Sequence, residues 1–433
     1  MRARRTLLSG ARVVDPVAGR DEVLDVLIEA TAVAAVGTDL DARGAAAIDC
    51  QGLVLIPGLV DLHAHLREPG GEHEETVETG CRAAALGGYT AVAAMANTDP
   101  VADHLAVIEE VRGLAARAGL CDVFPVGAVT KGLAGEELAE MGEMARAGVR
   151  LFSDDGRPVA DARLFRVALE YARAFDATVA SHCEEPSLAE GGQMREGYWS
   201  ATLGLAGIPA EAEEIAVARD LALARLTGGR LHLCHLSTQR SVELVRRAKE
   251  EGTRVTAEAT PHHLALTDEA LASYDPNLKV NPPLGTPEDR DALRLALARG
   301  TIDAVATDHA PHAVEEKEAE FDRAPPGTIG LETALAVALT ELVAPGLLTL
   351  PRVVEAMSTV PARILGASDH GGPIEPGRPA NLTAFDPAET WVVEPPFASR
   401  SRNSAFLGRT LTGRVVHTLL RGELVVADGK ATR

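Results

Sequence analysis

Two histidines, His63 and His65, are the first residues in the chain whose type and spacing suggest chemistry. They follow an apolar stretch at 52–58 that is bounded by glycine and proline, a pattern typical of a buried strand. Side chains alternate along a strand, so Asp61 and Arg67 would project to the same side as the two histidines. Imidazole is a favoured ligand of zinc and similar divalent cations. The pair alone fits ordinary polar residues equally well, because His-x-His is a weak motif.

Further apolar stretches also end in a carboxylate or an imidazole. They are 151–156 with Asp154 and Asp155, 178–184 with His182, 231–238 with His235, and 302–312 with Asp308 and His312. Taken singly, each of these residues is more often structural than functional. Five strand ends that each present a metal ligand are difficult to explain by chance, so the set predicts a metal centre.

Alternating strands and helices must position these residues. Apolar strands are predicted to end near His65, Asn97, Gly127, Ser153, His182, His235, Glu258 and Asp308. Helical patterns lie between them, for example at 136–147, 162–175 and 210–226. Eight strand-helix units over about 310 residues predict an α/β fold of the (β/α)8 TIM-barrel type. Chemistry in that fold lies at the carboxyl ends of the strands, where these residues fall.

Both ends of the chain look different from the middle, because they consist of short strands and turns. Neither end has enough strands for a stable sheet of its own. We therefore expect residues 1–56 and 369–433 to pair into one small β-sandwich, and residues 57–368 to form the barrel.

Composition limits the classes of partner. The 433 residues are 46% hydrophobic and carry a net charge of −21, which argues against nucleic acid and anionic membrane surfaces. No apolar run is long enough to span a bilayer, and the apolar region after the basic residues 1–5 is too short for a signal peptide. The five cysteines are odd in number and include no Cys-x-x-Cys pair, so we expect no disulfide framework and a cytoplasmic location.

At the level of motifs, the chain resembles the amidohydrolase superfamily and, within it, the shorter bacterial-type dihydroorotases. The resemblance covers nearly the whole chain and rests on a specific set of motifs. These are Asp61-Leu62-His63-Ala64-His65-Leu66-Arg67-Glu68-Pro69-Gly70, Asn97-Thr98, Ser153-Asp154-Asp155-Gly156, Ser181-His182-Cys183-Glu184, Cys234-His235-Leu236-Ser237-Thr238, Val280-Asn281-Pro282-Pro283-Leu284, Ala306-Thr307-Asp308-His309-Ala310-Pro311-His312 and Gly330-Leu331-Glu332-Thr333.

The resemblance implies two zinc ions in the barrel mouth. One would be held by His63, His65 and Asp308, and the other by His182 and His235. Many superfamily members bridge the metals with a carbamylated lysine, but 152–156 contains no lysine. In this branch an aspartate takes that place; we assign it to Asp155, with Asp154 as the alternative that the sequence leaves open.

The resemblance also implies a reaction. A hydroxide shared by the two metals would attack the ring amide carbonyl of dihydroorotate. Asp308 would accept the hydroxide proton and pass it to the departing nitrogen, and the reverse reaction would cyclise carbamoyl aspartate. Arg67 suits two-point contact with the substrate carboxylate; its alternative is a surface salt bridge with Glu68 or Glu72. The other substrate residues that the resemblance implies are Asn97, Asn281, His312, Pro326 and Gly327.

Three positions depart from the family pattern. Ala96 and Pro326 stand where a proline and an aromatic residue are usual, and Gly285 stands where an arginine is frequent. None of them is an expected metal ligand, so they bear on substrate affinity more than on reaction type.

Two other functions are consistent with the same motifs. The first is a related cyclic amidase acting on hydantoins, dihydropyrimidines or allantoin; Arg67 and the missing lysine argue against it. The second is a catalytically silent subunit that assembles with aspartate carbamoyltransferase. The presence of every expected metal ligand argues against this function. The family itself suggests a homodimer or a carbamoyltransferase complex.

Overall fold

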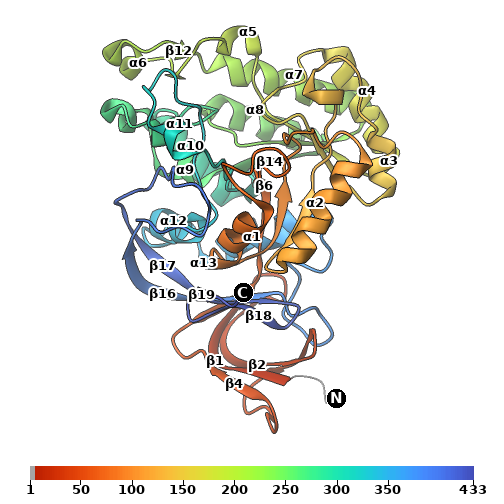
Figure 1. The fold of residues 1–433 in the computed structure, drawn as a ribbon, viewed down its shortest axis with the longest axis vertical. Helices are drawn as coiled ribbons and strands as arrows, with labels where there is room; N and C mark the ends of the chain where they lie inside the picture. Colours follow the sequence, from red (N-terminus) through yellow and green to blue (C-terminus); the bar gives the residue numbers. More distant parts are fainter. Residues whose placement is uncertain (1–4) are drawn as a thin grey trace.

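The computed structural model describes residues 5–433. Residues 1–4, which belong to the basic segment compared above with a signal peptide, lie outside the described residues. The two ends of the chain meet in one nine-stranded sheet, at the bottom of Figure 1. Its strands are β1 (Arg5–Asp15), β2 (Arg20–Glu29), β3 (Ala32–Gly37), β4 (Ala46–Asp49), β5 (Val54–Pro57), β16 (Leu382–Val392), β17 (Thr410–Leu420), β18 (Glu423–Ala427) and β19 (Lys430–Ala431).

The seam between the two ends is the antiparallel pair β5–β16, in which Ile56 lies opposite Thr383 and Leu55 opposite Ala384. A buried apolar cluster that includes Leu8, Val26 and Leu55 packs on this sheet. The ends therefore pair as expected, but the expected sandwich is not confirmed, because the strands belong to one hydrogen-bonded sheet.

The middle of the chain contains two main parallel sheets and one short parallel pair, Met194–Arg195 with Gly207–Ile208. The first consists of β6 (Leu59–Ala64), β7 (Tyr89–Ala94) and β8 (Asp122–Pro125). The second consists of β9 (Leu151–Ser153), β10 (Thr178–Ser181), β13 (Arg230–Leu233), β14 (Val255–Ala259) and β15 (Ala304–Val305).

Two parallel bridges join these sheets at both edges. Gly127, just after β8, bridges to Phe152 in β9, and His309, after β15, bridges to Ala64 in β6. The second junction includes a 2.8 Å hydrogen bond from the His65 N–H to the His309 carbonyl. The strand order thus returns to its start, as a closed parallel barrel requires.

Helices follow the parallel strands and surround them in Figure 1. The main ones are α1 (Val77–Leu86), α2 (Leu105–Ala118), α3 (Met141–Arg146), α4 (Ala162–Arg173), α7 (Glu211–Thr227), α8 (Gln239–Glu250), α10 (Pro287–Arg299), α12 (Ala334–Ala338), α13 (Leu350–Val354) and α14 (Val360–Leu365). Shorter elements include α5 (Pro186–Ala189), β11 (Met194–Arg195), α6 (Tyr198–Leu203), β12 (Gly207–Ile208), α9 (Pro261–Ala265) and α11 (Val314–Lys317).

The helices at 162–175 and 210–226 are confirmed within two residues as α4 and α7. The one expected at 136–147 begins only at Met141, because the residues before it extend along a neighbouring segment, where the Ala139 N–H donates to the Val129 carbonyl. All five cysteines are buried free thiols. Within residues 5–433, no helix has the length and apolarity needed to cross a membrane.

Candidate metal centre

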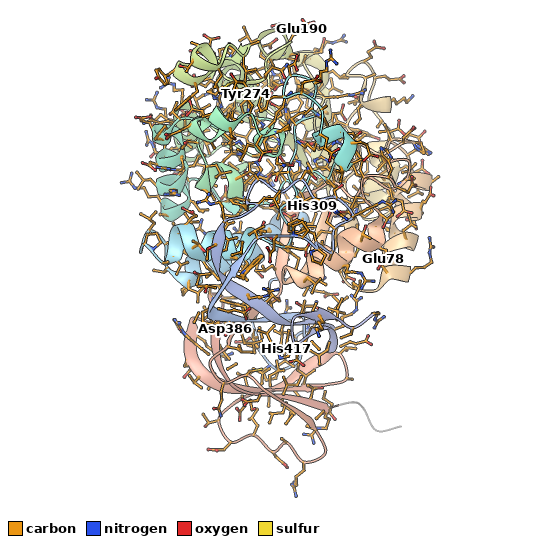
Figure 2. All side chains as sticks on the ribbon, turned by 60° about the vertical axis from the view of Figure 1, so that its left-hand side comes forward. Glu78, Glu190, Tyr274, His309, Asp386 and His417 are labelled. Carbon is orange, nitrogen blue, oxygen red and sulfur yellow. The ribbon has the colours of Figure 1, made fainter. Side chains whose placement is uncertain are left out.

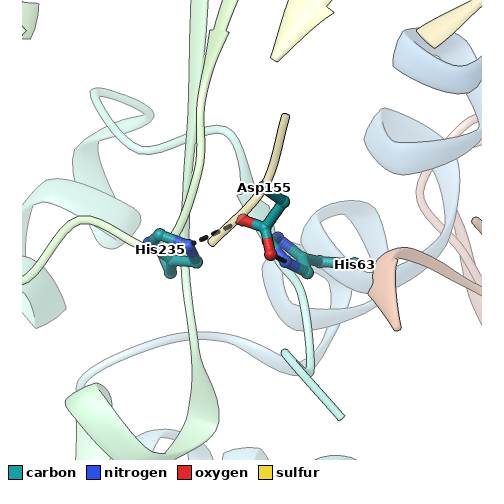
Figure 3. Close-up of side chains that lie close together, drawn as sticks. All are labelled: His63, Asp155 and His235. Atoms are coloured by element: carbon teal, nitrogen blue, oxygen red, sulfur yellow. Dashed lines mark hydrogen bonds and ion pairs between the residues drawn. The ribbon is translucent and has the colours of Figure 1, made fainter. Parts of the chain in front are cut away.

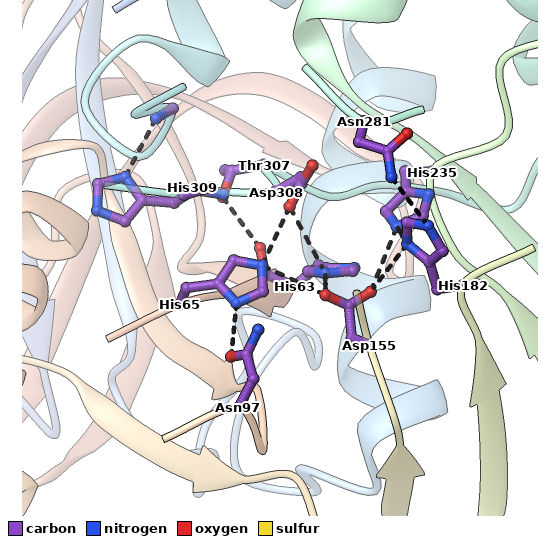
Figure 4. A network of polar contacts seen from close by, with 12 residues as sticks. His63, His65, Asn97, Asp155, His182, His235, Asn281, Thr307, Asp308 and His309 are labelled. Carbon is purple, nitrogen blue, oxygen red and sulfur yellow. Dashed lines mark hydrogen bonds and ion pairs between the residues drawn. The ribbon is translucent and has the colours of Figure 1, made fainter. Parts of the chain in front are cut away.

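One carboxylate, Asp155, lies among four histidines from the ends of three strands, β6, β10 and β13 (Figure 4). Figure 3 shows Asp155 between two of them, His63 and His235. Its Oδ2 is 3.3 Å from His63 Nε2 and 3.5 Å from His65 Nε2. Its Oδ1 is 3.4 Å from His235 Nε2 and 3.5 Å from His182 Nδ1. Each oxygen therefore faces one pair of imidazoles.

Asp308 adds a second carboxylate to one side of this cluster. Its Oδ1 lies 3.3 Å from His65 Nε2 and 3.6 Å from His63 Nε2. The backbone of Asp308 has φ +46°, a left-handed conformation that is uncommon for a residue other than glycine and often marks a functional site. The oxygen and two ring nitrogens form one compact group of potential metal ligands.

Asp154, the alternative to Asp155, points elsewhere. It accepts hydrogen bonds from the Val129 N–H at 2.7 Å and the Thr130 N–H at 3.0 Å, and another from the Thr130 hydroxyl. Burial raises its pKa to about 6. Asp154 thus holds the turn after β8, and the carboxylate that reaches the histidines is Asp155.

The electrostatics of the cluster favour ionised carboxylates. Burial alone would raise the pKa of Asp155, but the charge of His63 and hydrogen bonds from His182 and His235 lower it well below its usual range. Burial also acts to raise the pKa of Asp308. The hydrogen bond from His65 and the charges of His63 and His235 outweigh burial, so the pKa is lowered.

A divalent cation fits this donor set. His63 Nε2 is buried and has no hydrogen-bond partner among residues 5–433, and leaving such an atom unpaired is costly. Imidazole nitrogens and carboxylate oxygens that converge without hydrogen-bonding each other well are what zinc and similar metals bind.

Behind the cluster, Glu258 at the end of β14 orients His63. Its Oε1 accepts from His63 Nδ1 at 3.0 Å, and its Oε2 accepts from His232 Nε2 at 2.9 Å. Burial opposes its ionisation, but these two histidines lower the pKa of Glu258 to about 2. Fixing Nδ1 in this way turns Nε2 of His63 toward Asp155. The sequence analysis placed a strand end at Glu258 without giving it a role; its position in line with the other strand-end residues was the available signal.

Asn97 makes the corresponding contact to His65. Its Oδ1 accepts from His65 Nδ1 at 2.9 Å. The structure thus places Asn97 behind a cluster histidine, while the expectation from the sequence was a substrate contact.

Arg67 and His312 meet on a shared carboxylate, Glu74. Arg67 Nε lies 3.0 Å from one oxygen of Glu74, and His312 Nδ1 lies 3.0 Å from the other. His312 Nε2 also donates to the Pro326 carbonyl at 2.9 Å. The alternative of a surface salt bridge with Glu68 or Glu72 is therefore wrong. The partner is Glu74, and the Arg67 side chain is only 13% exposed, so the pair does not lie on the surface. The strand alternation that placed Arg67 in line with the histidines also stops early, because β6 ends at Ala64 and Arg67 has φ +60°.

Asn281 borders the cluster at His182, and Gly327 lies beside His312. Asn281 Nδ2 lies 3.3 Å from His182 Nε2 (Figure 4), and its Oδ1 is buried without a partner in the described part of the chain. The Gly327 N–H donates to the Lys279 carbonyl at 2.8 Å. A cavity of about 240 Å³ is lined by Glu184, Lys279, Asn281 and Pro326, among others.

Comparison with known proteins agrees with the motif analysis. A family model described as Dihydro-orotase-like matches residues 52–241. A protein of Streptomyces coelicolor named dihydroorotase is 56% identical over 99% of this chain and 100% of its own length. Proteins of the same name are 51% identical in Pelotomaculum thermopropionicum, over 98% of this chain and 99% of theirs, and 53% identical in Mycobacterium tuberculosis, over 95% and 97%.

Solved structures share the fold at lower identity. The L-hydantoinase (dihydropyrimidinase) of Arthrobacter aurescens has a TM-score of 0.88 and 28% identity, over 99% of this chain and 97% of its own. The dihydropyrimidinase of Brevibacillus agri has a TM-score of 0.85 and 26% identity, over 99% and 96%. These are amidohydrolases of mixed α/β content, as expected for the fold class.

Proposed function

Because this chain belongs to the dihydroorotase family, we propose that it catalyses the reversible cyclisation of N-carbamoyl-L-aspartate to L-dihydroorotate, a step of de novo pyrimidine biosynthesis. The observation that carries the proposal from family to site is the Asp155 carboxylate, each of whose oxygens faces a pair of histidines.

We assign two zinc ions to this cluster. His63, His65 and Asp308 would hold one, His182 and His235 would hold the other, and Asp155 would bridge them. This division follows the two carboxylate oxygens of Asp155, because Oδ2 faces His63 and His65 whereas Oδ1 faces His182 and His235. When bound, the ions would activate a water molecule for attack and polarise the ring amide carbonyl.

Asp308 is the proton carrier in this assignment. The surrounding histidines lower its pKa, so the group is ionised, and an ionised carboxylate can accept a proton from the attacking water. The same carboxyl group then protonates the ring nitrogen as the C–N bond breaks. In the biosynthetic direction Asp308 removes the proton from the carbamoyl nitrogen as the C–N bond forms, and returns it to the departing hydroxide, which leaves as water.

Arg67 is assigned to the substrate carboxylate. Its Nε is engaged by Glu74 and by the Pro311 carbonyl, which leaves the edge formed by the two terminal nitrogens for bidentate contact. Asn281, His312, Pro326 and Gly327 complete the pocket. Asn97 acts mainly through His65 in this arrangement.

Finer features of the protein are proposed on the same basis. The circular order of parallel strands supports a (β/α)8 barrel over residues 57–368, with residues 1–56 and 369–433 forming the appended β-domain. A cytoplasmic homodimer, or a complex with aspartate carbamoyltransferase, is the assembly that the family suggests.

The deciding experiment is absorbance-followed ring opening of dihydroorotate by metal-replete protein, with a hydantoin assayed in parallel. Turnover of dihydroorotate alone supports the proposal. Activity on the hydantoin alone would reassign the substrate to that of the 26–28% identical structural neighbours. Inactivity on both, with metal bound, would favour a non-catalytic assembly subunit.

A further inference from the structure

A segment from the far end of the chain, Ser399–Asn403, lies against the loops that border the candidate metal centre. It belongs to the connection between β16 and β17 of the end sheet, outside the barrel residues 57–368. Asn403 is 3% exposed, and a buried amide needs hydrogen-bond partners.

The Asn403 side chain joins two loops. Its Nδ2 donates to the Ala310 carbonyl at 2.9 Å and to the Gly327 carbonyl at 3.0 Å. Its Oδ1 accepts from the His312 N–H at 3.1 Å. The partners fix the orientation of the amide, because two are acceptors and one is a donor. The Asn403 carbonyl also accepts from the Ile329 N–H at 3.0 Å.

The two loops approach each other closely at this point. Gly327 has φ +146°, and a Cβ at that position would lie 2.9 Å from the Ala310 Cβ and 2.9 Å from a ring carbon of His312. His312 Nε2 also reaches the Pro326 carbonyl. Small shifts in either loop would therefore move both His312 and the Pro326–Gly327 backbone.

We propose that Asn403 is a positioning residue of the substrate pocket, which holds the loop 310–312 and the loop 326–327 at the separation needed to grip the substrate ring and its carboxylate. This inference rests on the proposed function, because that function assigns His312, Pro326 and Gly327 to the substrate. Aspartate at this position would keep the acceptor for His312 and lose the donor to both carbonyls. Leucine, of similar size, would lose both.

The test compares Asn403→Leu and Asn403→Asp with Arg402→Ala, which changes an exposed neighbour in the same segment. We expect both Asn403 variants to raise KM for dihydroorotate roughly tenfold or more, since buried hydrogen bonds are lost. Metal content of both Asn403 variants should stay near that of the wild type, with a smaller change in kcat than in KM. Arg402→Ala should behave as the wild type.

Amide hydrogen exchange gives a readout that does not depend on the substrate. Peptides covering 308–313 and 326–330 should exchange faster in both Asn403 variants than in Arg402→Ala. Unchanged exchange with KM within twofold of wild type would overturn the inference. If wild-type protein does not turn over dihydroorotate, the proposed function fails, while faster exchange in the variants would still support the positioning of the loops.

Discussion

The cluster around Asp155 consists of buried histidines and carboxylates, whereas the sheet made by the two chain ends is packed with apolar side chains. In the sheet, strands from both ends bury apolar side chains such as Leu55 and pair through regular backbone hydrogen bonds. At the metal centre, buried histidines and carboxylates crowd together, and Asp308 and His235 have positive φ. Figure 2 shows the two settings, with His309 in the part of the molecule above the sheet and Asp386 and His417 at the sheet.

This difference indicates that the end sheet mainly stabilises the fold, whereas the cluster around Asp155 mainly serves function. Packing in the sheet contributes to the free energy of folding without touching the reacting atoms. The metal centre contains buried charges and strained backbone, which by themselves do not increase the free energy of unfolding. It depends on surrounding contacts and on bound metal, so the two regions should respond differently to substitution.

The largest effect should come from removing the metals. Chelation, or Asp155→Ala, should lower turnover by more than about 100-fold, because the donors no longer organise the reacting water. Added zinc should restore the chelated wild type and leave Asp155→Ala inactive. Asp154→Asn is the matched control; full loss of metal in that variant and not in Asp155→Ala would reverse the assignment of the two aspartates.

Asp308→Asn should lower kcat by about 10²- to 10⁴-fold, the usual range for a lost general acid-base. The amide can still act as a weak oxygen donor, so part of the metal should remain, as measured by elemental analysis. An exposed aspartate variant, Asp291→Asn, serves as the control. Turnover within a few fold of wild type would rule out the assigned role.

Arg67→Ala should raise KM for dihydroorotate by roughly 10- to 100-fold, since a bidentate charged contact is lost. Metal content should be close to that of wild type. Loss of metal with unchanged affinity, measured by calorimetric titration, would instead make Arg67 a structural residue of the cluster.

In the sheet, Leu55→Ala should lower the free energy of unfolding by about 2–5 kcal/mol, because it leaves a cavity in a packed core. The kcat and metal content of the folded variant should be unchanged. Val23→Ala, an exposed change in the same sheet, should have little effect on either. A large drop in kcat for folded Leu55→Ala would contradict the separation of the two regions.

The smallest effect concerns Glu332, where burial raises the pKa to about 7. The unfolded state releases this proton near pH 4.5, so the folded state binds more protons between pH 4.5 and 7. Stability should therefore fall as pH rises through that window. Glu332→Gln should flatten this part of the profile in denaturant unfolding at pH 5 and pH 7.5, whereas the exposed change Glu110→Gln should leave it intact. An unaltered slope in Glu332→Gln would contradict the assignment.

The sequence by itself determined the family and the order of strands and helices, because hydrophobic periodicity and short motifs are local properties. It also supplied the residue types at the strand ends, such as His63, His182 and Asp308. It left Asp154 and Asp155 undecided, because they are neighbours and only the turn at Val129–Thr130 shows which of them is already engaged.

Tertiary structure alone decided the contacts between residues far apart in the chain. Glu74 between Arg67 and His312 and Asn403 across two loops have no local signal, since Glu74 pairs with a residue 238 positions away and Asn403 with one 93 positions away. Glu258 is recognisable as a strand-end residue, but its contact with His63, 195 residues away, is not. The same holds for the joining of the chain ends into one sheet, because the register of Ile56 against Thr383 is set by long-range packing.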